Sequence, residues 1–222
     1  MTAQELYSQF VDLLQKEDKG KAVQLVLEKL ESGELDILTL YSEILTPAQN
    51  GLVCWQDDSL CIWREHVRTS IVRTVLECCY PYVVKEIPKY RVANGEKVII
   101  GCPSEEYHEI GARMVADYFT LLGFHVTFVG ANTPQSEIMN AIAHVKPKIV
   151  GISVSNFYNL VAAGKIVGSL ARIRKEEDLD FRIVVGGNAF RLNPKAHENI
   201  GADAVLQTFG DLKRYAGEVL QR

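Results

Sequence analysis

Five short runs rich in β-branched residues punctuate the C-terminal half, and a segment long enough for a helix separates each run from the next. The runs are Lys97 to Ile100, His125 to Val129, Ile149 to Ser153, Arg182 to Val185 and Ala202 to Leu206. Strands that alternate with helices pack as a parallel sheet with helices on both faces. The sequence therefore predicts an α/β domain with a doubly wound, five-stranded parallel sheet, whose ligand-binding edge is built from the loops after the strands.

The N-terminal half has a different period, because from Thr2 to about Val84 its apolar residues recur at helical spacing. Pro47 interrupts the third of these patterns, either near its end or as a kink. N-cap candidates follow at 57–59. One face of the long helix predicted behind them carries Leu60, Trp63, Val67, Ile71, Val75 and Cys79. We predict a four-helix bundle over residues 1–90, a linker within 88–96, and the α/β domain over 91–222.

Composition and charge narrow the class of protein. With 222 residues, 47% of them hydrophobic, the chain can bury a core of one or two domains. A net charge of -4 argues against a broad surface that binds nucleic-acid phosphates. The N-terminus lacks a basic segment followed by a cleavage site, and no apolar run approaches the ~20 residues that span a bilayer. The five cysteines form no Cys-x-x-Cys pair, which favours reduced, buried thiols. We expect a cytoplasmic protein that contacts neither membrane nor DNA directly.

The loop after the first strand, GCPSEEYHEIG at 101–111, places His108 two residues after Glu106 and three before Gly111. It has no glycine-rich pattern that would hold a nucleotide phosphate, and a structural zinc site would need several Cys or His ligands at characteristic spacing. A single imidazole suits a metal whose other positions are already filled, with its second nitrogen donating to Glu106. The alternatives are a surface or helix-capping histidine and a solvated acid near a helix start.

Two later loops also carry candidate ligand contacts. Ser153 and Ser155 follow the third strand, and Gly186 and Gly187 follow the fourth. Paired glycines let a backbone approach a bulky ligand closely. The alternatives are a helix cap for Ser153 and a simple turn for the glycines.

Taken in order, Glu106-x-His108-x-x-Gly111, Ser153-x-Ser155 and Gly186-Gly187 resemble the cobalamin (vitamin B12)-binding domain family. Its commonest form is Asp-x-His-x-x-Gly, Ser-x-Leu or Ser-x-Thr, and Gly-Gly, so Glu106 and Ser155 depart from it. The resemblance implies a flavodoxin/Rossmann-like domain in which His108 is the lower axial ligand of cobalt and displaces the cofactor's dimethylbenzimidazole. It also implies a buried nucleotide tail, with these contacts: Ser153, Ser155, Gly186, Gly187 and, more weakly, Thr208.

In the helical half, Trp55 is followed after nine residues by Glu65-His66. Alone, this pattern fits a core tryptophan and a solvated pair. Ahead of a cobalamin domain it resembles the light-sensing and regulatory adenosylcobalamin proteins. That resemblance implies a bundle that caps the upper cofactor face, with Trp55 over the adenosyl group, Glu65 at its polar atoms and His66 beside it. Gln56 stands where a histidine can bind cobalt after illumination in such sensors, so a photoproduct of that kind is in doubt.

The resemblance implies a non-catalytic sensor that binds adenosylcobalamin and signals light or cobalamin status to a protein partner such as a transcription regulator. Many such sensors carry a DNA-binding module before the bundle; this sequence begins with the bundle pattern, which favours no DNA contact in the same chain. The alternative is a corrinoid methyl carrier that serves methyltransferases and does not require Trp55 or Glu65-His66. Methylcobalamin, hydroxocobalamin and a homo-oligomer stay open. A mutase subunit is disfavoured, because the chain has no catalytic barrel.

Overall fold

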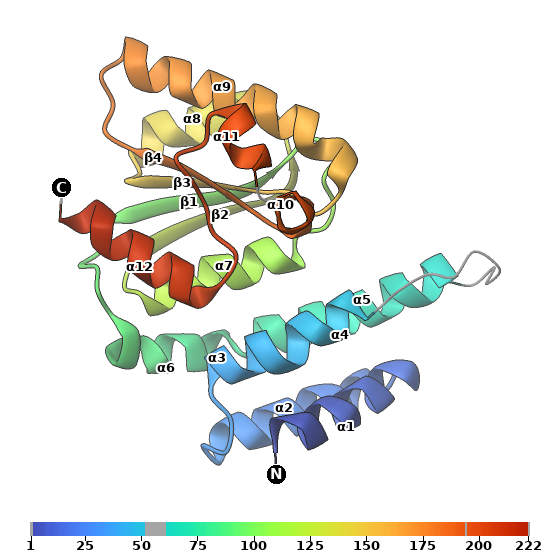
Figure 1. Cartoon of the computed structure of the whole chain (residues 1–222). Helices are drawn as coiled ribbons and strands as arrows, with labels where there is room; N and C mark the ends of the chain where they lie inside the picture. Colours follow the sequence, from blue (N-terminus) through green and yellow to red (C-terminus); the bar gives the residue numbers. More distant parts are fainter. Residues whose placement is uncertain (1, 52–60, 194, 222) are drawn as a thin grey trace. The chain divides into compact units, whose positions relative to one another are not determined.

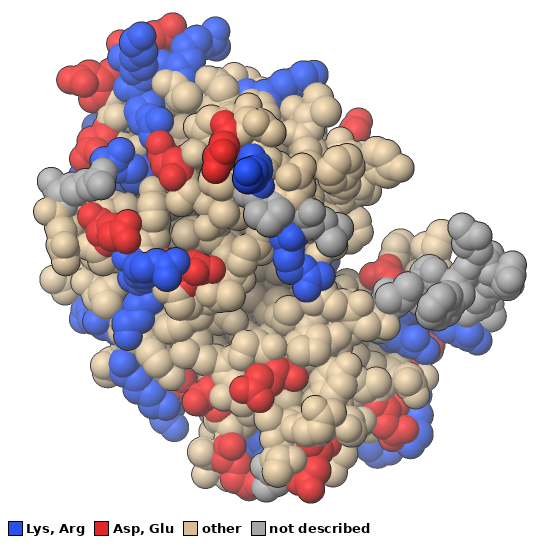
Figure 2. Space-filling model, viewed as in Figure 1, with Lys and Arg blue, Asp and Glu red and all other residues tan. Residues whose placement is uncertain are grey.

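The computed structural model describes residues 2–51, 61–193 and 195–221, and the chain divides into two compact units, Met1–Glu86 and Ile87–Arg222. Within the described ranges, no helix is both long and apolar enough to cross a membrane. On the face drawn in Figure 2, Lys and Arg side chains are interspersed with Asp and Glu among the described residues.

The first unit opens with two helices that lie side by side (Figure 1). α1 (Ala3–Gln15) begins at a capping box, in which Thr2 and Glu5 each accept a hydrogen bond from the other's backbone N–H. α2 (Lys19–Glu31) begins at Asp18, whose side chain accepts from Lys21 N. Phe10 of α1 is fully buried, as the helical spacing of apolar residues predicts.

The third helical pattern forms one continuous run with a π-helical centre. It consists of α3 (Ile37–Thr39), η1 (Leu40–Leu45) and α4 (Thr46–Asn50). Pro47 lies in the first turn of α4, where it cannot donate a hydrogen bond to the preceding turn. The wider π-helical turn directly before it accommodates this missing donor. Pro47 therefore changes the winding of the run close to its end, and the helix stops at Asn50.

α5 (Cys61–Cys78) packs against α2 and buries Ile71, Val72, Val75 and Leu76. The predicted apolar face is correct in this C-terminal part, but Trp63 is 57% exposed and does not belong to the core. α6 (Tyr80–Tyr90) continues through Pro88, so the beginning of the predicted linker is helical. Residues 57–59, the predicted N-cap of the long helix, and Leu60 of its predicted apolar face lie outside the described residues.

The second unit is built on a five-stranded parallel sheet. Its strands are β1 (Lys97–Pro103), β2 (His125–Thr133), β3 (Ile149–Ser153), β4 (Arg182–Gly186) and β5 (Ala204–Val205). Their order in the sheet is β2-β1-β3-β4-β5, and every neighbouring pair is parallel. The predicted α/β class, the doubly wound flavodoxin-like sheet and the N-terminal helical region are confirmed.

Helices cover both faces of this sheet (Figure 1). One layer holds α7 (Ile110–Leu121) and α12 (Phe209–Leu220), which contact each other. The other holds α8 (Gln135–Val145) and α9 (Leu160–Glu176). The short helices η2 (Phe157–Asn159), α10 (Asn188–Leu192) and α11 (Ala196–Ile200) complete the connections.

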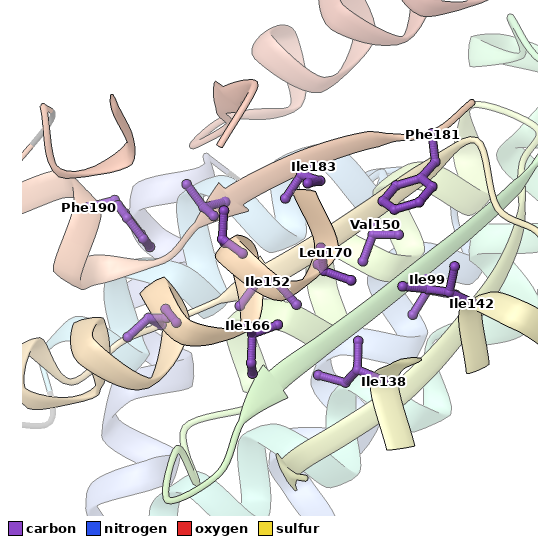
Figure 3. Close-up of a cluster of buried hydrophobic side chains, with 14 of the residues drawn as sticks. Ile99, Ile138, Ile142, Val150, Ile152, Ile166, Leu170, Phe181, Ile183 and Phe190 are labelled. Carbon is purple, nitrogen blue, oxygen red and sulfur yellow. The ribbon is translucent and has the colours of Figure 1, made fainter. Parts of the chain in front are cut away.

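Figure 3 shows the core under α8 and α9, where Ile138 and Ile166 meet the strand residues Ile99, Val150 and Ile152. Strands buried on both faces explain the uninterrupted apolar runs of the sequence.

The strand order places the topological switch point between β1 and β3. The chain leaves β1 toward β2 on one side, and then crosses to β3 on the other side of β1. The loops after β1 and β3 therefore diverge to opposite faces, which opens a crevice at the carboxyl ends of these two strands. Open α/β sheets bind their ligands at such a point.

Candidate functional site

The loop after β1 brings Glu106 and His108 together. The Glu106 side chain is completely buried, and its Oε1 accepts hydrogen bonds from His108 Nδ1 at 2.6 Å and from the His108 backbone N at 3.0 Å. The hydrogen bond predicted between these two side chains is therefore present. The imidazole itself is 61% exposed.

The second oxygen of Glu106 crosses the switch point to the loop after β3. Its Oε2 accepts from the backbone N atoms of Ser155 and Asn156, both at 2.9 Å, and from Asn159 Nδ2 at 3.2 Å. Asn159 also donates to the carbonyl oxygen of Glu105 at 3.2 Å. One carboxylate thus fastens the two diverging loops to each other and holds the imidazole between them.

These contacts fix the charge of Glu106. Burial alone would raise the pKa of its carboxyl group, but the hydrogen bonds from the His108 side chain, the Asn156 and His108 backbones and Asn159 lower that pKa to about 2. The carboxylate is therefore ionised at neutral pH and acts only as an acceptor. In the neutral imidazole, this acceptor favours the tautomer with the proton on His108 Nδ1 and the lone pair on Nε2.

The neighbouring thiol is unsuited to bind a metal at neutral pH. Burial, followed by the charges of Glu106 and Glu109, raises the pKa of Cys102 to about 12. The protonated thiol is a poor ligand, since the thiolate is the form that binds metals. His108 is thus the better donor in this loop.

Gly111 has space around it in the first turn of α7. A Cβ atom built there would meet no heavy atom within 4 Å. The glycine leaves the surface one turn after His108 unobstructed, as a site for a wide ligand requires.

The two other glycines of the predicted site have packing roles of their own. A Cβ at Gly186 would lie 2.6 Å from the Leu206 carbonyl oxygen, and one at Gly187 would lie 2.8 Å from the Val154 carbonyl carbon. Gly187 also has a φ of +98°, which favours glycine. The close approach of backbone at the ends of β3, β4 and β5 already requires both residues, and their contact with a nucleotide tail stays a prediction.

The remaining predicted residues of this unit lie at strand or helix ends. Ser153 is half-buried at the end of β3, and Ser155, also half-buried, contributes its backbone N–H to Glu106. Thr208 is exposed and forms the capping box of α12 with Asp211. Helix capping accounts for Thr208, so its weaker assignment as a ligand contact also stays a prediction.

The Glu65-His66 pair lies on α5, and Trp55 lies outside the described residues. Glu65 Oε1 accepts from Thr69 Oγ1 at 2.7 Å, and Thr69 in turn accepts from Gln49 Nε2 at 3.1 Å. Glu65 Oε2 lies 3.5 Å from His66 Nε2, and the His66 side chain is 74% exposed.

Sequence reasoning missed Asn159 and Asn132, which both contact the loop that carries His108. Asn159 is 9% exposed, and a buried amide needs hydrogen-bond partners. Its place in the loop after β3 was a signal that could have found it, because loops at the switch point face one another.

Comparison with known proteins agrees with this geometry. Residues 96–213 match the family described as the B12 binding domain. Two Myxococcus xanthus proteins are 27% identical: HTH-type transcriptional repressor CarA over 63% of this chain, and HTH-type transcriptional repressor CarH over 81%. The matched regions make up 45% and 57% of those proteins, so the chain spans about half of their length.

Solved structures share the fold over nearly the whole chain. The monomethylamine corrinoid protein of Methanosarcina barkeri has a TM-score of 0.78 at 18% identity, covering 98% of this chain and 100% of that one. A cobalamin-binding protein from Desulfitobacterium hafniense DCB-2 has a TM-score of 0.52 at 19% identity, covering 96% and 98%. With the family match over more than half of its residues, this chain belongs to the B12-binding domain family and is a cobalamin-binding protein.

Proposed function

We propose that the protein is a non-catalytic sensor that binds adenosylcobalamin, with His108 as the lower axial ligand, and that it signals light or cobalamin status to a protein partner. The observation that carries cobalt ligation is the exposed imidazole of His108, whose Nδ1 lies 2.6 Å from a buried carboxylate oxygen of Glu106. A carboxylate behind a ligating histidine fixes the tautomer and raises the basicity of the other nitrogen.

The residues present fit a corrinoid. A macrocycle already fills four positions around cobalt, so one imidazole nitrogen completes the lower face. In this proposal Glu106 orients His108, Gly111 leaves room for the disc, and the nucleotide tail contacts Ser153, Ser155, Gly186, Gly187 and Thr208. The bound cofactor would supply a light-sensitive cobalt–carbon bond.

Two observations support the sensor over other cobalamin proteins. The pattern Trp55-x9-Glu65-His66 resembles the regulatory group, and the similarity to CarH, a protein named as a transcriptional repressor, extends over 81% of the chain. We propose that Trp55, Glu65 and His66 contact the adenosyl group, and that its loss is what the partner detects. The partner is then a transcription regulator.

The second candidate is a corrinoid methyl carrier. It is favoured by the 24% identity, over 61% of this chain, to a protein of Desulfitobacterium hafniense (strain Y51) named as a corrinoid protein. A carrier would present methylcobalamin to methyltransferases and would not need the Trp55 and Glu65-His66 pattern.

One experiment separates the two. The full chain is purified anaerobically, loaded with adenosylcobalamin or methylcobalamin, and followed by absorption and by its size in solution before and after green light. Tighter adenosylcobalamin binding, with a light-dependent change in size or in partner binding, supports the sensor. The Trp55→Ala variant should lose the preference for adenosylcobalamin, with Trp63→Ala as the matched control. Equal binding of both cofactors, together with methyl transfer to an added methyltransferase, would establish the carrier instead.

A further inference from the structure

Two non-glycine residues with left-handed backbone lie next to each other beside His108. Glu105 has a φ of +68° and Asn132 a φ of +48°. Asparagine tolerates this region better than glutamate does. Strained backbone of this kind persists where surrounding contacts over-determine it, and it gathers at functional sites.

Two hydrogen bonds, one donated in each direction, join Asn132 to the loop that carries His108. The Glu105 backbone N donates to Asn132 Oδ1 at 2.8 Å, and the Asn132 backbone N donates to the carbonyl oxygen of Glu106 at 2.9 Å. Asn132 therefore holds two consecutive residues of the loop, directly before Tyr107 and His108. Its side chain is exposed and contributes nothing to the core.

The C-terminal end of β2 also holds the chain just after the histidine. Glu109 Oε2 accepts from the Ala131 backbone N at 2.9 Å. His108 is thus flanked by anchors to β2 on both sides, while the Glu106 carboxylate is anchored to the loop after β3. The contacts on the β3 side position the carboxylate, and those on the β2 side position the backbone that carries the imidazole.

We propose that Asn132 is a positioning residue for cobalt ligation. It holds the loop in the conformation in which His108 Nε2 can bond cobalt before the cofactor arrives. This inference rests on the proposed ligation by His108. The apparent affinity of a loop that samples several conformations falls in proportion to the fraction of time that it spends in the competent one.

Three variants isolate this role. Asn132→Gly accepts the left-handed φ and removes the Oδ1 acceptor, whereas Asn132→Asp keeps an acceptor oxygen and tolerates the same φ. Asp178→Gly is the matched control, because Asp178 is another exposed, left-handed residue, with a φ of +51°. Asp178 precedes β4 and therefore lies at the amino ends of the strands, whereas the His108 loop lies at their carboxyl ends. Circular dichroism and the thermal midpoint verify that each variant folds.

The readouts are the affinity of the full chain for hydroxocobalamin, the rate of imidazole ligation, and the nitrogen splitting in the electron paramagnetic resonance spectrum of reduced Co(II). We expect Asn132→Gly to bind about tenfold more weakly, the lower end of the effects known for residues behind metal ligands. Part of its bound cobalt should also lose the nitrogen splitting. Asn132→Asp and Asp178→Gly should match the wild type.

An Asn132→Gly variant that binds and ligates like Asp178→Gly would overturn the role of Asn132. If the wild-type protein, labelled with ¹⁵N-histidine, binds hydroxocobalamin but shows no ¹⁵N splitting, ligation by His108 itself is wrong, because the nitrogen atoms of dimethylbenzimidazole carry no label. The two failures are therefore distinguishable.

Discussion

Glu106–His108 and Glu65–His66 are both Glu–His pairs, and they differ in almost every physical respect. In the sheet unit, the completely buried Glu106 carboxylate lies 2.6 Å from the imidazole of His108. In the helical unit, Glu65 and His66 are 3.5 Å apart, with side chains 27% and 74% exposed. The side chains of Glu106 and His108 are held in one geometry before any ligand binds, whereas the more exposed side chains of Glu65 and His66 can still change conformation.

Backbone geometry explains this difference. Consecutive residues of a helix do not face one another, so Glu65 cannot orient the His66 ring, and it bonds Thr69 one turn later instead. Glu106 and His108 are separated by one residue in a turn, which lets the side chain fold back onto the imidazole and onto the backbone N of His108. A residue pair of the same composition is thus held in one geometry in a turn and stays adjustable on a helix.

The largest effect that this comparison predicts is that of removing the fixed imidazole. His108→Ala should lose the absorption spectrum of nitrogen-ligated cobalamin. It should also lose more affinity than the about 10–100-fold typical of removing a residue that hydrogen-bonds a metal ligand. Anaerobic titration with hydroxocobalamin and absorption spectroscopy measure both quantities. His66→Ala is the control and should keep the spectrum. If instead His66→Ala loses the spectrum and His108→Ala keeps it, His66 and not His108 binds cobalt.

The next effect concerns the carboxylate. Glu106→Gln places an amide among five backbone and side-chain donors, so either its NH₂ group faces Ser155 and Asn156, or it faces His108. In the second orientation the amide favours a proton on His108 Nε2, the tautomer that cannot bind cobalt. We expect cobalamin affinity to fall about 10–100-fold.

Glu65→Gln is the matched substitution on the helix. It should leave hydroxocobalamin affinity and the nitrogen-ligated spectrum unchanged, and should weaken adenosylcobalamin binding only. Parallel titrations of both variants with both cofactors measure this. If Glu65→Gln alters the spectrum as strongly as Glu106→Gln does, the two carboxylates affect the cobalt ligand equally and the proposed difference between the pairs is wrong.

The sequence predicts the fixed site well, because that site is local. A histidine in the turn after a strand, with a carboxylate two residues before it, places both side chains within reach of each other whatever the rest of the chain does. The positions of the strands could be predicted equally well, because strands covered by helices on both faces need uninterrupted apolar residues.

What the sequence does not reveal depends on contacts between loops. Asn132, near the end of β2, and Asn159, in the loop after β3, are distant from His108 along the chain, and only the strand order brings them to its loop. Trp63 was placed on the buried face of its helix because it keeps the apolar period, although its own turn is exposed. Periodicity indicates which face of a helix is apolar, but tertiary packing decides how far along the helix that face is covered.

The pH dependence of stability tests the ionisation of the fixed pair. Because the folded-state pKa of Glu106 is lowered to about 2, its stabilising contribution is fully present above the unfolded pKa of about 4.3. It is lost as the pH falls from about 5 to about 2. The unfolding free energies of wild type and Glu106→Gln, measured with urea in the cofactor-free protein, should differ by on the order of 3 kcal/mol at pH 7 and converge toward pH 2. A difference that does not change with pH would mean that folding leaves the pKa of Glu106 unshifted, and a difference that shrinks as the pH rises would mean that the carboxyl group is uncharged in the fold.

The smallest effect is expected where a side chain supports the adjustable pair. Thr69 donates to Glu65 as Asn159 donates to Glu106, but the first contact is partly exposed and the second is buried. Thr69→Val removes the hydroxyl at nearly constant shape and should cost less than about 1 kcal/mol of unfolding free energy, because water can replace the lost donor. Asn159→Ala leaves the buried carboxylate of Glu106 and the carbonyl oxygen of Glu105 with one donor fewer each and should cost about 1–3 kcal/mol. Urea unfolding of the two variants in the same buffer measures the difference. Equal costs would show that Glu65 is held as firmly as Glu106, and the helical pair would then have to be regarded as a second preorganised site.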